Sequence, residues 1–364
     1  MIPVKKVLST LLATSMILLT LSGCTSTTSS NSASATPTTV VEEDITLNVY
    51  NWGDYMDPEV IAQFEEENPH IKIQETYFDS NEAMLAKLKA DSSTFDIVIP
   101  SDYVVERMIK EDMLAEIDKS NIPNYAGLLD YCKNQSFDPN NKYSIPYMWG
   151  TVGILYNTKK VTETVDSWNI LFNTKYKKKI IMYDSIRESM LVALKLQGKS
   201  CNTKDDADLK AAENLLISQK PLVLAYGTDE IKRKMINNEA ALAVVYSGDA
   251  ILAMDENEDL EYVIPKEGSN VWFDNIVILK NSTHKKAAET FINFLCRPDV
   301  AAKNSAYIGY TTPVEQAIED LGEGYSDNPA YNPSTEVIER CEIYHDLEDY
   351  MQKYNEIWIN IKSS

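Results

Sequence analysis

The chain has 364 residues, and its 34 basic and 55 acidic side chains give a formal net charge of −21 at pH 7. So acidic a surface excludes nucleic acid as an expected partner, because it repels a phosphate backbone. It would attract small polycations, although the solubility of a secreted protein explains the charge nearly as well. His70, His284 and His345 form no ligand-spaced pair, so we expect no metal site, no cofactor and no histidine-based nucleophile.

The N-terminus has the pattern of a secretory signal. Lys5 and Lys6 precede an apolar stretch over residues 7–21, which is too short to span a membrane. Leu21-Ser22-Gly23-Cys24 resembles the lipobox of bacterial lipoproteins, whose cysteine is acylated and becomes the first mature residue. We therefore expect residues 1–23 to be removed and the lipid on Cys24 to anchor the chain to the cell membrane. The folded part would lie outside the cytoplasm, in the periplasm if an outer membrane is present. An ordinary cleaved signal is the alternative.

Residues 24–43 are a predicted tether. They are rich in Ser, Thr, Ala, Asn and Pro, a composition that cannot bury a core. Roughly 320 residues follow, enough for two lobes. Four cysteines lie in this part, and they allow three pairings: Cys132, Cys201, Cys296 and Cys341. We expect no structural disulfide, and a buried free thiol at Cys296.

Strands and helices are predicted to alternate along the folded part, as in a mainly parallel α/β architecture. Strands are expected at residues 45–50, from 71, at 95–99, 180–183, 241–246 and 275–279. Between the first three, Asp57-Pro58 and the run at 79–81 begin two helices with apolar faces, giving a βαβαβ start. Another helix is expected over 285–296, stopped by Arg297-Pro298, and one or two more within 336–361.

Aromatic and acidic residues follow several of these strands. They stand at residues 51–55, 101–103, 184–188 and 247–249, and Trp272-Phe273-Asp274 repeats the combination. Ligands of open α/β sheets bind beyond the carboxyl ends of the strands, so these loops are expected to share a cleft. Carboxylates among ring faces suit an organic cation, since its charge needs an anion and its methylene groups need apolar walls.

Several stretches in this order resemble the spermidine/putrescine-binding proteins of bacterial polyamine ABC importers. They include Tyr50-Asn51-Trp52, Ser80-Asn81-Glu82, residues 84–89, Pro100-Ser101, residues 137–141, residues 143–147, Trp149-Gly150, residues 265–268 and Ile308-Gly309-Tyr310. The resemblance implies a two-lobed α/β fold of the periplasmic-binding-protein type, with crossing strands between the lobes. We expect one lobe to comprise residues 44–150 plus 274–319, and the other 151–273 plus 320–364.

The resemblance also implies a set of ligand-binding residues. Matching positions are Trp52, Tyr55, Ser101, Tyr103, Glu188, Trp272, Asp274 and Tyr310, to which we add Asp54, Asp184, Tyr246 and Asp249. Asp249 matches a carboxylate of the putrescine-preferring branch, whereas Tyr246 replaces a Trp. Asp184 adjoins Ser185, which stands where the spermidine-preferring branch has an Asp, and Tyr344 replaces an amide. These departures leave the choice of polyamine open.

Each assignment has a structural alternative. We expect Asp274 to pair with a terminal ammonium and Glu188 and Asp249 to serve the other end or an internal amine; Asp249 could instead cap a helix. Trp52 and Trp272 could simply pack in the core, and Tyr103 and Tyr310 between the lobes. Asp54 could reach an amine through water or stabilise its turn. Asp102 and Arg187 are expected to be structural or surface charges.

The resulting hypothesis is a monomeric, membrane-tethered polyamine receptor that hands spermidine or putrescine to the permease subunits of an ABC importer by hinged closure, without catalysis. A sugar or other small-solute receptor is one alternative, since aromatic walls also stack on sugar rings. An extracellular hydrolase using Glu188 with Asp249 or Asp274 as an acid-base pair is another. A sensor or adhesion role, with binding but no transport, is a third.

Overall fold

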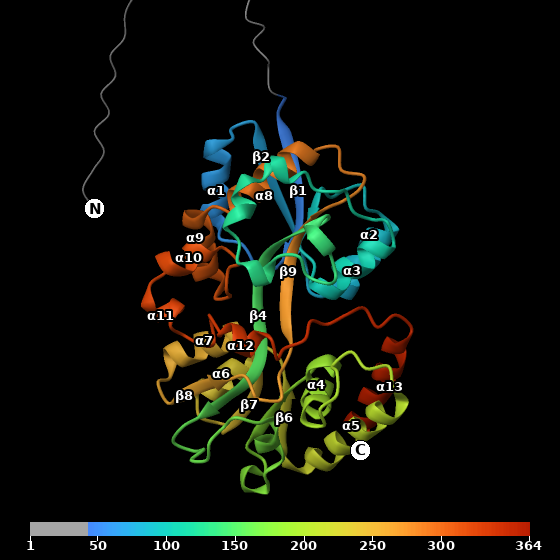
Figure 1. The fold of residues 1–364 in the computed structure, drawn as a ribbon, viewed down its shortest axis with the longest axis vertical. Helices are drawn as coiled ribbons and strands as arrows, with labels where there is room; N and C mark the ends of the chain where they lie inside the picture. Colours follow the sequence, from blue (N-terminus) through green and yellow to red (C-terminus); the bar gives the residue numbers. More distant parts are fainter. Residues whose placement is uncertain (1–42) are drawn as a thin grey trace, which may run out of the picture. The chain divides into compact units, whose positions relative to one another are not determined.

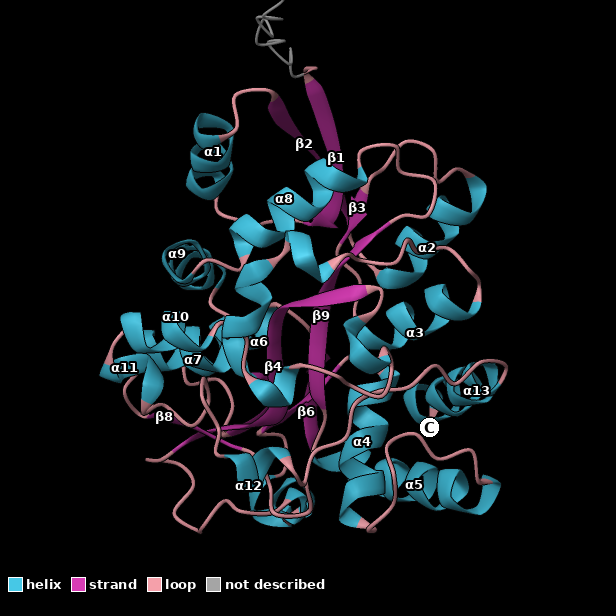
Figure 2. Cartoon of the chain, turned by 45° about the horizontal axis from the view of Figure 1, so that its top comes forward, coloured by secondary structure: helices cyan, strands magenta, loops and turns pink. Residues whose placement is uncertain are grey.

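The computed structural model describes residues 43–364, so the predicted signal, Cys24 and nearly all of the predicted tether lie outside the described residues. The described strands form one nine-stranded sheet in the order β2-β1-β3-β9-β4-β7-β5-β6, with β8 also paired to β4. Helices flank both halves of this sheet, which gives an α/β fold of two lobes (Figures 1 and 2).

The first lobe begins with the expected βαβαβ unit. It consists of β1 (Ile45–Trp52), α1 (Pro58–Glu67), β2 (Ile71–Phe78), α2 (Asn81–Ala90) and β3 (Ile97–Val98). The strands are parallel, with β1 between β2 and β3. Asp57 caps α1 by accepting a hydrogen bond from the backbone N of Glu59, and Ser80 caps α2 in the same way.

Between β3 and the next long strand the chain forms α3 (Asp102–Lys110) and four short 3₁₀ helices. These are η1 (Lys119–Asn121), η2 (Pro123–Gly127), η3 (Asp130–Cys132) and η4 (Pro139–Asn141). They cover the first lobe and bring the chain to the middle of the sheet.

Two antiparallel strands, β4 (Ser144–Asn157) and β9 (Val271–Ile278), cross between the lobes. The first half of β4 pairs with β9, and its second half pairs with β7 and β8, whereas β9 reaches β3 at its far end. Figure 1 shows the two strands side by side between the groups of helices. The expectation of a mainly parallel sheet was therefore wrong: each lobe has parallel strands, but the crossing strands make the sheet mixed.

The second lobe follows β4. Its elements are η5 (Trp168–Phe172), η6 (Thr174–Tyr176), β5 (Ile180–Tyr183), α4 (Ile186–Leu196), α5 (Asp206–Gln219), η7 (Lys220–Leu222), β6 (Val223–Gly227), α6 (Glu230–Ile236), β7 (Leu242–Tyr246), α7 (Ser247–Glu256) and β8 (Leu260–Val263). β5 pairs in parallel with β6 and β7, so the predicted strands at 180–183 and 241–246 are confirmed, whereas β6 and β8 were not predicted.

Helices form most of the chain after β9. They are α8 (Lys285–Leu295), α9 (Pro298–Ile308), α10 (Glu315–Asp320), α11 (Glu323–Ser326), α12 (Thr335–Ile338) and α13 (Tyr350–Ser363). Arg297-Pro298 does end the helix predicted over 285–296, but the proline is also the first residue of α9.

Residues 339–349, which we call the strap, contact both lobes. Glu342 forms an ion pair with Lys195 of α4, and its backbone N donates to the Ser269 carbonyl, 2.8 Å away. On the first lobe, Glu106 of α3 accepts from the backbone N of Asp346 at 3.0 Å and from the His345 ring at 3.1 Å. The strap therefore joins the lobes in addition to β4 and β9.

Each lobe has its own apolar core. Phe64, Phe291 and Trp149 are among the largest fully buried side chains of the first, and Trp168 and Tyr354 among those of the second. The cysteines of residues 43–364 are free thiols, and burial raises the pKa of Cys296 to about 12. Within the same residues, none of the helices combines the length and apolarity that a membrane crossing needs.

Replacing Gly268 by Ala is expected to destabilise the fold. The φ angle of Gly268 is 85°, and a Cβ added there would lie 2.0 Å from the carbonyl oxygen of Arg340 in the strap. The left-handed conformation alone costs about 1–2 kcal/mol for an L-residue, and the clash adds to it. Urea unfolding should therefore show a loss of at least about 2 kcal/mol in the free energy of unfolding.

Gly127→Ala is the matched control, because no atom lies within 4 Å of the added Cβ. It should change the free energy of unfolding by less than about 1 kcal/mol. Equal stability of the two variants would contradict the close contact between Gly268 and the strap.

Candidate ligand-binding site

Asp274 of β9 is the buried acid around which the predicted residues gather. Its side chain accepts one hydrogen bond from the Ser101 hydroxyl and one from the Tyr55 hydroxyl, both at 2.7 Å. Ser101 follows β3 and Tyr55 follows β1, and a β-bridge joins Ser101 to Asp274. The predicted meeting of the loops after the first and third strands is therefore confirmed.

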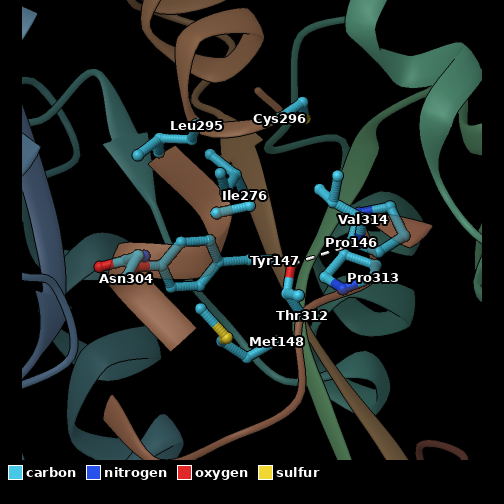
Figure 3. A pocket seen from close by; sticks show the side chains of 11 residues that line it. Pro146, Tyr147, Met148, Ile276, Leu295, Cys296, Asn304, Thr312, Pro313 and Val314 are labelled. Atoms are coloured by element: carbon cyan, nitrogen blue, oxygen red, sulfur yellow. Dashed lines mark hydrogen bonds between the residues drawn. The ribbon is translucent and has the colours of Figure 1, made fainter. Parts of the chain in front are cut away.

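The two hydroxyl donors are themselves held in place. The Asn81 amide donates to the Ser101 hydroxyl at 3.0 Å, and the Tyr147 hydroxyl donates to the Tyr55 carbonyl at 2.7 Å. Asn304 donates in turn to the Tyr147 hydroxyl at 2.7 Å. Figure 3 shows Tyr147 extending toward Asn304. Both residues line a small void of about 10 Å³. These contacts hold Tyr55 and Ser101 in position.

A continuous run of rings leads away from Asp274. Measured between ring centroids, Tyr55 lies 6.3 Å from Tyr310, Tyr310 lies 5.1 Å from Trp272, and Trp272 lies 6.0 Å from Tyr246. Each of these pairs has edge-to-face geometry. Tyr183 continues the run at 5.0 Å from Tyr246. Such rings present both apolar faces and hydroxyl groups, so they can wall a cation that has a hydrocarbon chain.

Glu188, in the first turn of α4, is a second buried acid at the other end of this run. Its Oε1 accepts from the Tyr246 hydroxyl at 2.8 Å, and only 5% of the residue is exposed. Tyr344 of the strap is also buried, and the Glu188 carboxylate helps to raise its pKa after the larger effect of burial. Its hydroxyl has no hydrogen-bond partner among the described residues.

Asp249 lies at the edge of the run, in the first turn of α7. The neighbouring Gly248 touches Tyr310 so closely that an added Cβ would come within 2.3 Å of its ring. Burial raises the pKa of Asp249, and an ion pair with Lys232 at 3.4 Å opposes that effect. The alternative that Asp249 caps its helix was wrong, because Tyr246 is the N-cap residue.

Trp52 and Tyr103 lie at the first-lobe side. The Trp52 indole donates to the Ile99 carbonyl at 2.9 Å, and its ring packs on Phe78. The Tyr103 hydroxyl bonds Asn81 and the Glu82 carboxylate, at 3.1 and 3.2 Å. Trp52 is thus anchored to the core by one edge, as the packing alternative required, and Tyr103 shares Asn81 with Ser101.

Two predicted residues are not brought to this group. Asp184 forms an ion pair with Lys362 of α13 at 2.7 Å, and its charge affects Tyr226 rather than the rings described above. Asp54 is exposed and has a φ angle of 51°, as expected of a residue that forms a turn. Asp54 was included because it adjoins Tyr55, and Asp184 because it adjoins Ser185, at the position where the spermidine-preferring branch has an Asp.

Asp102 and Arg187 are structural, as predicted. Asp102 accepts from the backbone N of Tyr103 at 2.7 Å and of Phe273 at 3.1 Å, and burial raises its pKa well above the usual range. The Arg187 guanidinium lies 4.1 Å from the centroid of the Tyr344 ring and donates to Asn202. Neither leaves a free charge at the site.

Asn81, Tyr147, Tyr183 and Lys232 are the residues of the site that sequence analysis missed. Asn81 was interpreted only as a possible helix cap, and Tyr147 and Tyr183 lie within strands, where a tyrosine usually signals packing. The position of Tyr183 at the last residue of β5 was the one available signal. Nothing in the sequence relates Lys232 to Asp249, because they lie on different helices.

A larger cavity of about 430 Å³ lies elsewhere, between the strap and β9. Its lining comes from both lobes and includes Tyr131, Ser200, Phe273, Glu342 and His345. None of the predicted ligand-binding residues lines it. Among residues 43–364 there is also no cluster of His, Cys, Asp or Glu that could hold a metal ion.

The pKa of Asp274 is raised to about 6, because burial disfavours the charged form more than the Ser101 and Tyr55 hydrogen bonds favour it. No basic side chain of the described residues pairs with this acid. The ionised site is therefore a buried negative charge without a counter-ion, which is the arrangement that an incoming cation would complete.

Comparisons with known proteins bear on the family and the fold of the chain. Residues 59–333 match the family model described as bacterial extracellular solute-binding protein. The chain is 36% identical over 324 residues to the spermidine/putrescine-binding periplasmic protein of Escherichia coli, covering 88% of this chain and 93% of that one. It is 32% identical over 337 residues to the putrescine-binding periplasmic protein SpuD of Pseudomonas aeruginosa, covering 87% and 92%.

A solved structure is similar as well. The spermidine/putrescine ABC transporter substrate-binding protein PotD of Streptococcus pneumoniae superposes with a TM-score of 0.81 at 41% identity, covering 87% of this chain and 98% of that one. The two-lobed fold with crossing strands is thus common to both.

Stability without ligand should fall as pH rises through the titration of Asp274. The folded chain keeps the proton up to about pH 6, whereas an unfolded Asp loses it near pH 4, so ionisation is penalised only in the folded state. Between about pH 4 and pH 7 the wild type should lose roughly 2 kcal/mol of unfolding free energy relative to Asp274→Asn. Urea unfolding of both proteins across this range measures the difference.

Asp184→Asn, which changes an exposed acid in the same way, should keep the wild-type pH dependence. If Asp274→Asn and the wild type gave parallel curves, Asp274 would not be the buried titrating group.

Proposed function

Because the chain belongs to the bacterial extracellular solute-binding proteins, we propose that it binds a polyamine outside the cytoplasm and delivers it to an ABC importer. The observation that carries this proposal is Asp274: a buried carboxylate that two hydroxyls orient and no basic side chain of residues 43–364 neutralises. A ligand ammonium would supply the missing charge and hydrogen bonds.

The second end of the ligand is assigned to Glu188. It is buried, it is oriented by the Tyr246 hydroxyl, and it pairs with no Lys or Arg among the described residues. Tyr310, Trp272 and Tyr246 stand between the two acids and would enclose the methylene chain. A sugar is disfavoured, because an uncharged ligand would leave both carboxylates buried without counter-charge. We assign neither acid a catalytic role.

Ligand capture is proposed to occur by closure of the lobes about the crossing strands. β4 exchanges its partner β9 for β7 near Gly150 and Thr151, which supports a division at this point. The proposed lobes are residues 44–150 plus 274–319 and residues 151–273 plus 320–364. The Asp274 group lies on the first and Glu188 on the second, so a bound diamine would hold them together.

Membrane attachment is proposed from the sequence at Cys24, with the chain acting as a monomer at the outer face of the membrane and docking on permease subunits. A single lipid-bearing cysteine and a polar tether leave the lobes free to move. The mature chain then needs no spanning helix of its own.

Polyamine binding should be strong in the wild type and weak in Asp274→Asn. Removing the charge leaves a buried ammonium without its partner, which costs roughly 3–5 kcal/mol, or more than about a hundredfold in Kd. Isothermal titration calorimetry with putrescine and spermidine measures this loss. Asp184→Asn, the matched control on the surface, should bind as the wild type does. A change of less than tenfold in Asp274→Asn would refute the role of Asp274, and a wild type that binds neither compound would refute the proposed function.

Replacement of Cys24 by Ser should release the protein from the membrane. The serine cannot be acylated, so the full chain is expected in the medium or periplasm instead of the membrane fraction, with its binding of polyamine unchanged. Fractionation with immunodetection gives the distribution. Cys296→Ser, which alters a buried thiol in the folded part, is the control and should stay membrane-bound. Membrane retention of the Cys24 variant would exclude the proposed anchor.

A further inference from the structure

Asn81, the first residue of α2, is hydrogen-bonded to two residues of the candidate site. Its side-chain nitrogen donates to the Ser101 hydroxyl at 3.0 Å and to the Tyr103 hydroxyl at 3.1 Å. Its side-chain oxygen accepts from the backbone N of Ser101 at 3.3 Å. Only 5% of Asn81 is exposed, so water has little access to these groups. An amide nitrogen has two hydrogens, and both are directed at hydroxyls of the site.

The backbone determines which end of the Asn81 amide is the nitrogen. The backbone N of Ser101 can only donate, so the amide atom that faces it must be the oxygen. The nitrogen then faces the hydroxyls and can only donate to them. α2 does not need this side chain at its N-terminus, because Ser80 supplies the cap. The amide therefore acts on the site rather than on the end of its own helix.

The direction of the Ser101 hydroxyl follows from this donor. A serine hydroxyl has one hydrogen, and Ser101 Oγ lies 3.0 Å from the Asn81 nitrogen and 2.7 Å from Asp274 Oδ1. Because Ser101 must accept from Asn81, its own hydrogen is left for Asp274. The ionised carboxylate accepts this hydrogen, whereas protonation at Oδ1 would set two hydrogens against each other. The contact with Asn81 therefore favours the ionised form of Asp274.

The Tyr103 hydroxyl is directed in the same way. It accepts from Asn81, so its hydrogen goes to the Glu82 carboxylate at 3.2 Å. Glu82 is exposed, and its charge is screened by water. The one amide thus orients two hydroxyls, one toward a buried acid and one toward an exposed acid.

We propose that Asn81 is a positioning residue of the ligand site: by donating to Ser101 it holds the Ser101 hydroxyl as a donor to Asp274, which keeps the carboxylate in the form that binds a cation. The inference rests on the proposed function where it concerns the ligand. Without the amide, the Ser101 hydroxyl is free to turn and to accept a hydrogen from the neutral acid. Protonated Asp274 then gains a hydrogen bond that Asn81 now prevents.

Other titratable groups also lie near Asp274. Asp102 of α3 is a buried acid whose pKa is raised by burial and, to a smaller extent, by the charge of Asp274. Three tyrosines are affected by the same charge, and burial raises the pKa of each above its usual value: Tyr55, Tyr147 and Tyr310. All four groups remain when Asn81 is replaced. A comparison of the wild type with an Asn81 variant at two pH values therefore isolates the effect of the amide.

Replacement of Asn81 by Ala should weaken polyamine binding more in acid than in alkaline solution. The pKa of Asp274 is expected to rise from about 6 to about 7, because the neutral carboxyl gains an acceptor and the ionised carboxylate loses a fixed donor. The cation needs the ionised form. The ratio of variant to wild-type Kd for putrescine should therefore be about fivefold larger at pH 6 than at pH 8, as measured by titration calorimetry.

Asn157→Ala, at the end of β4, is the matched control. Asn157 is also buried, with 1% exposed, and its side chain also forms three hydrogen bonds. These hydrogen bonds are to Asn238 and to the backbone N of Lys159 and Lys160, and none of these residues belongs to the candidate site. Both variants should lose stability, but the Kd of Asn157→Ala should keep the same ratio to the wild type at both pH values.

A double variant tests whether Asn81 acts through Ser101. Once Ser101→Ala has removed the hydroxyl, adding Asn81→Ala should leave the pH dependence of binding as it is in Ser101→Ala alone. If Asn81→Ala does not fold, Asn81→Ser takes its place, because the shorter side chain also lacks the amide donors. The same pH dependence is expected of it.

Equal Kd ratios for the Asn81 variant at pH 6 and pH 8 would overturn the inference, as would a further change in the double variant. A wild type that binds neither putrescine nor spermidine would overturn the proposed function instead. The role of Asn81 can then be decided without ligand. The fall in unfolding free energy with rising pH should continue about one pH unit higher in Asn81→Ala than in the wild type, and coincident curves would refute it.

Discussion

The antiparallel pairing of β4 with β9 is the constraint on which the rest of the structure depends. Successive side chains of a strand point to opposite faces, so Trp272 and Asp274 share the face of the proposed ligand site, while Phe273 lies between them on the other face. Phe273 is buried against Trp149 of β4, with the rings stacked at 6.3 Å. Core packing therefore fixes the register, and a slip of one residue would move Trp272 and Asp274 to the opposite face, away from the proposed site.

The unpaired charge of Asp274 lowers the stability of the folded chain, but it leaves the carboxylate available to a cation. A basic partner for Asp274 would stabilise the fold but would also occupy the position proposed for the ligand ammonium. Neutral donors, the Tyr55 and Ser101 hydroxyls, orient the carboxylate without cancelling its charge. Asp249 shows the other solution, a carboxylate satisfied by Lys232 within its own lobe. Asp274 thus has an unpaired charge that the proposed ligand could neutralise, whereas the charge of Asp249 is already paired within the fold.

Much of the fold and of the site could be predicted from the sequence, for local reasons. The βαβαβ start followed from caps and apolar runs. Tyr55 and Ser101 were assigned from positions after strands and from the family resemblance, and Asp274 from the recurring aromatic-acid combination and the same resemblance. β4 was missed as a strand because its 14 residues are buried on both faces and show no alternation. Lys362 beside Asp184 and Lys232 beside Asp249 could not be predicted, since each pair is formed by helix packing between distant segments.

The raised pKa of Asp274 has a consequence for the empty site. Below about pH 6 the carboxyl carries a hydrogen ion, which is then the resident cation that an incoming ammonium displaces. The proposed binding then becomes an exchange below this pH: affinity falls about tenfold for each further pH unit, and a hydrogen ion is released into the buffer. On the alkaline side it is simple association. In acidic surroundings, protons would therefore compete with the proposed ligand for the two carboxylate oxygens of Asp274.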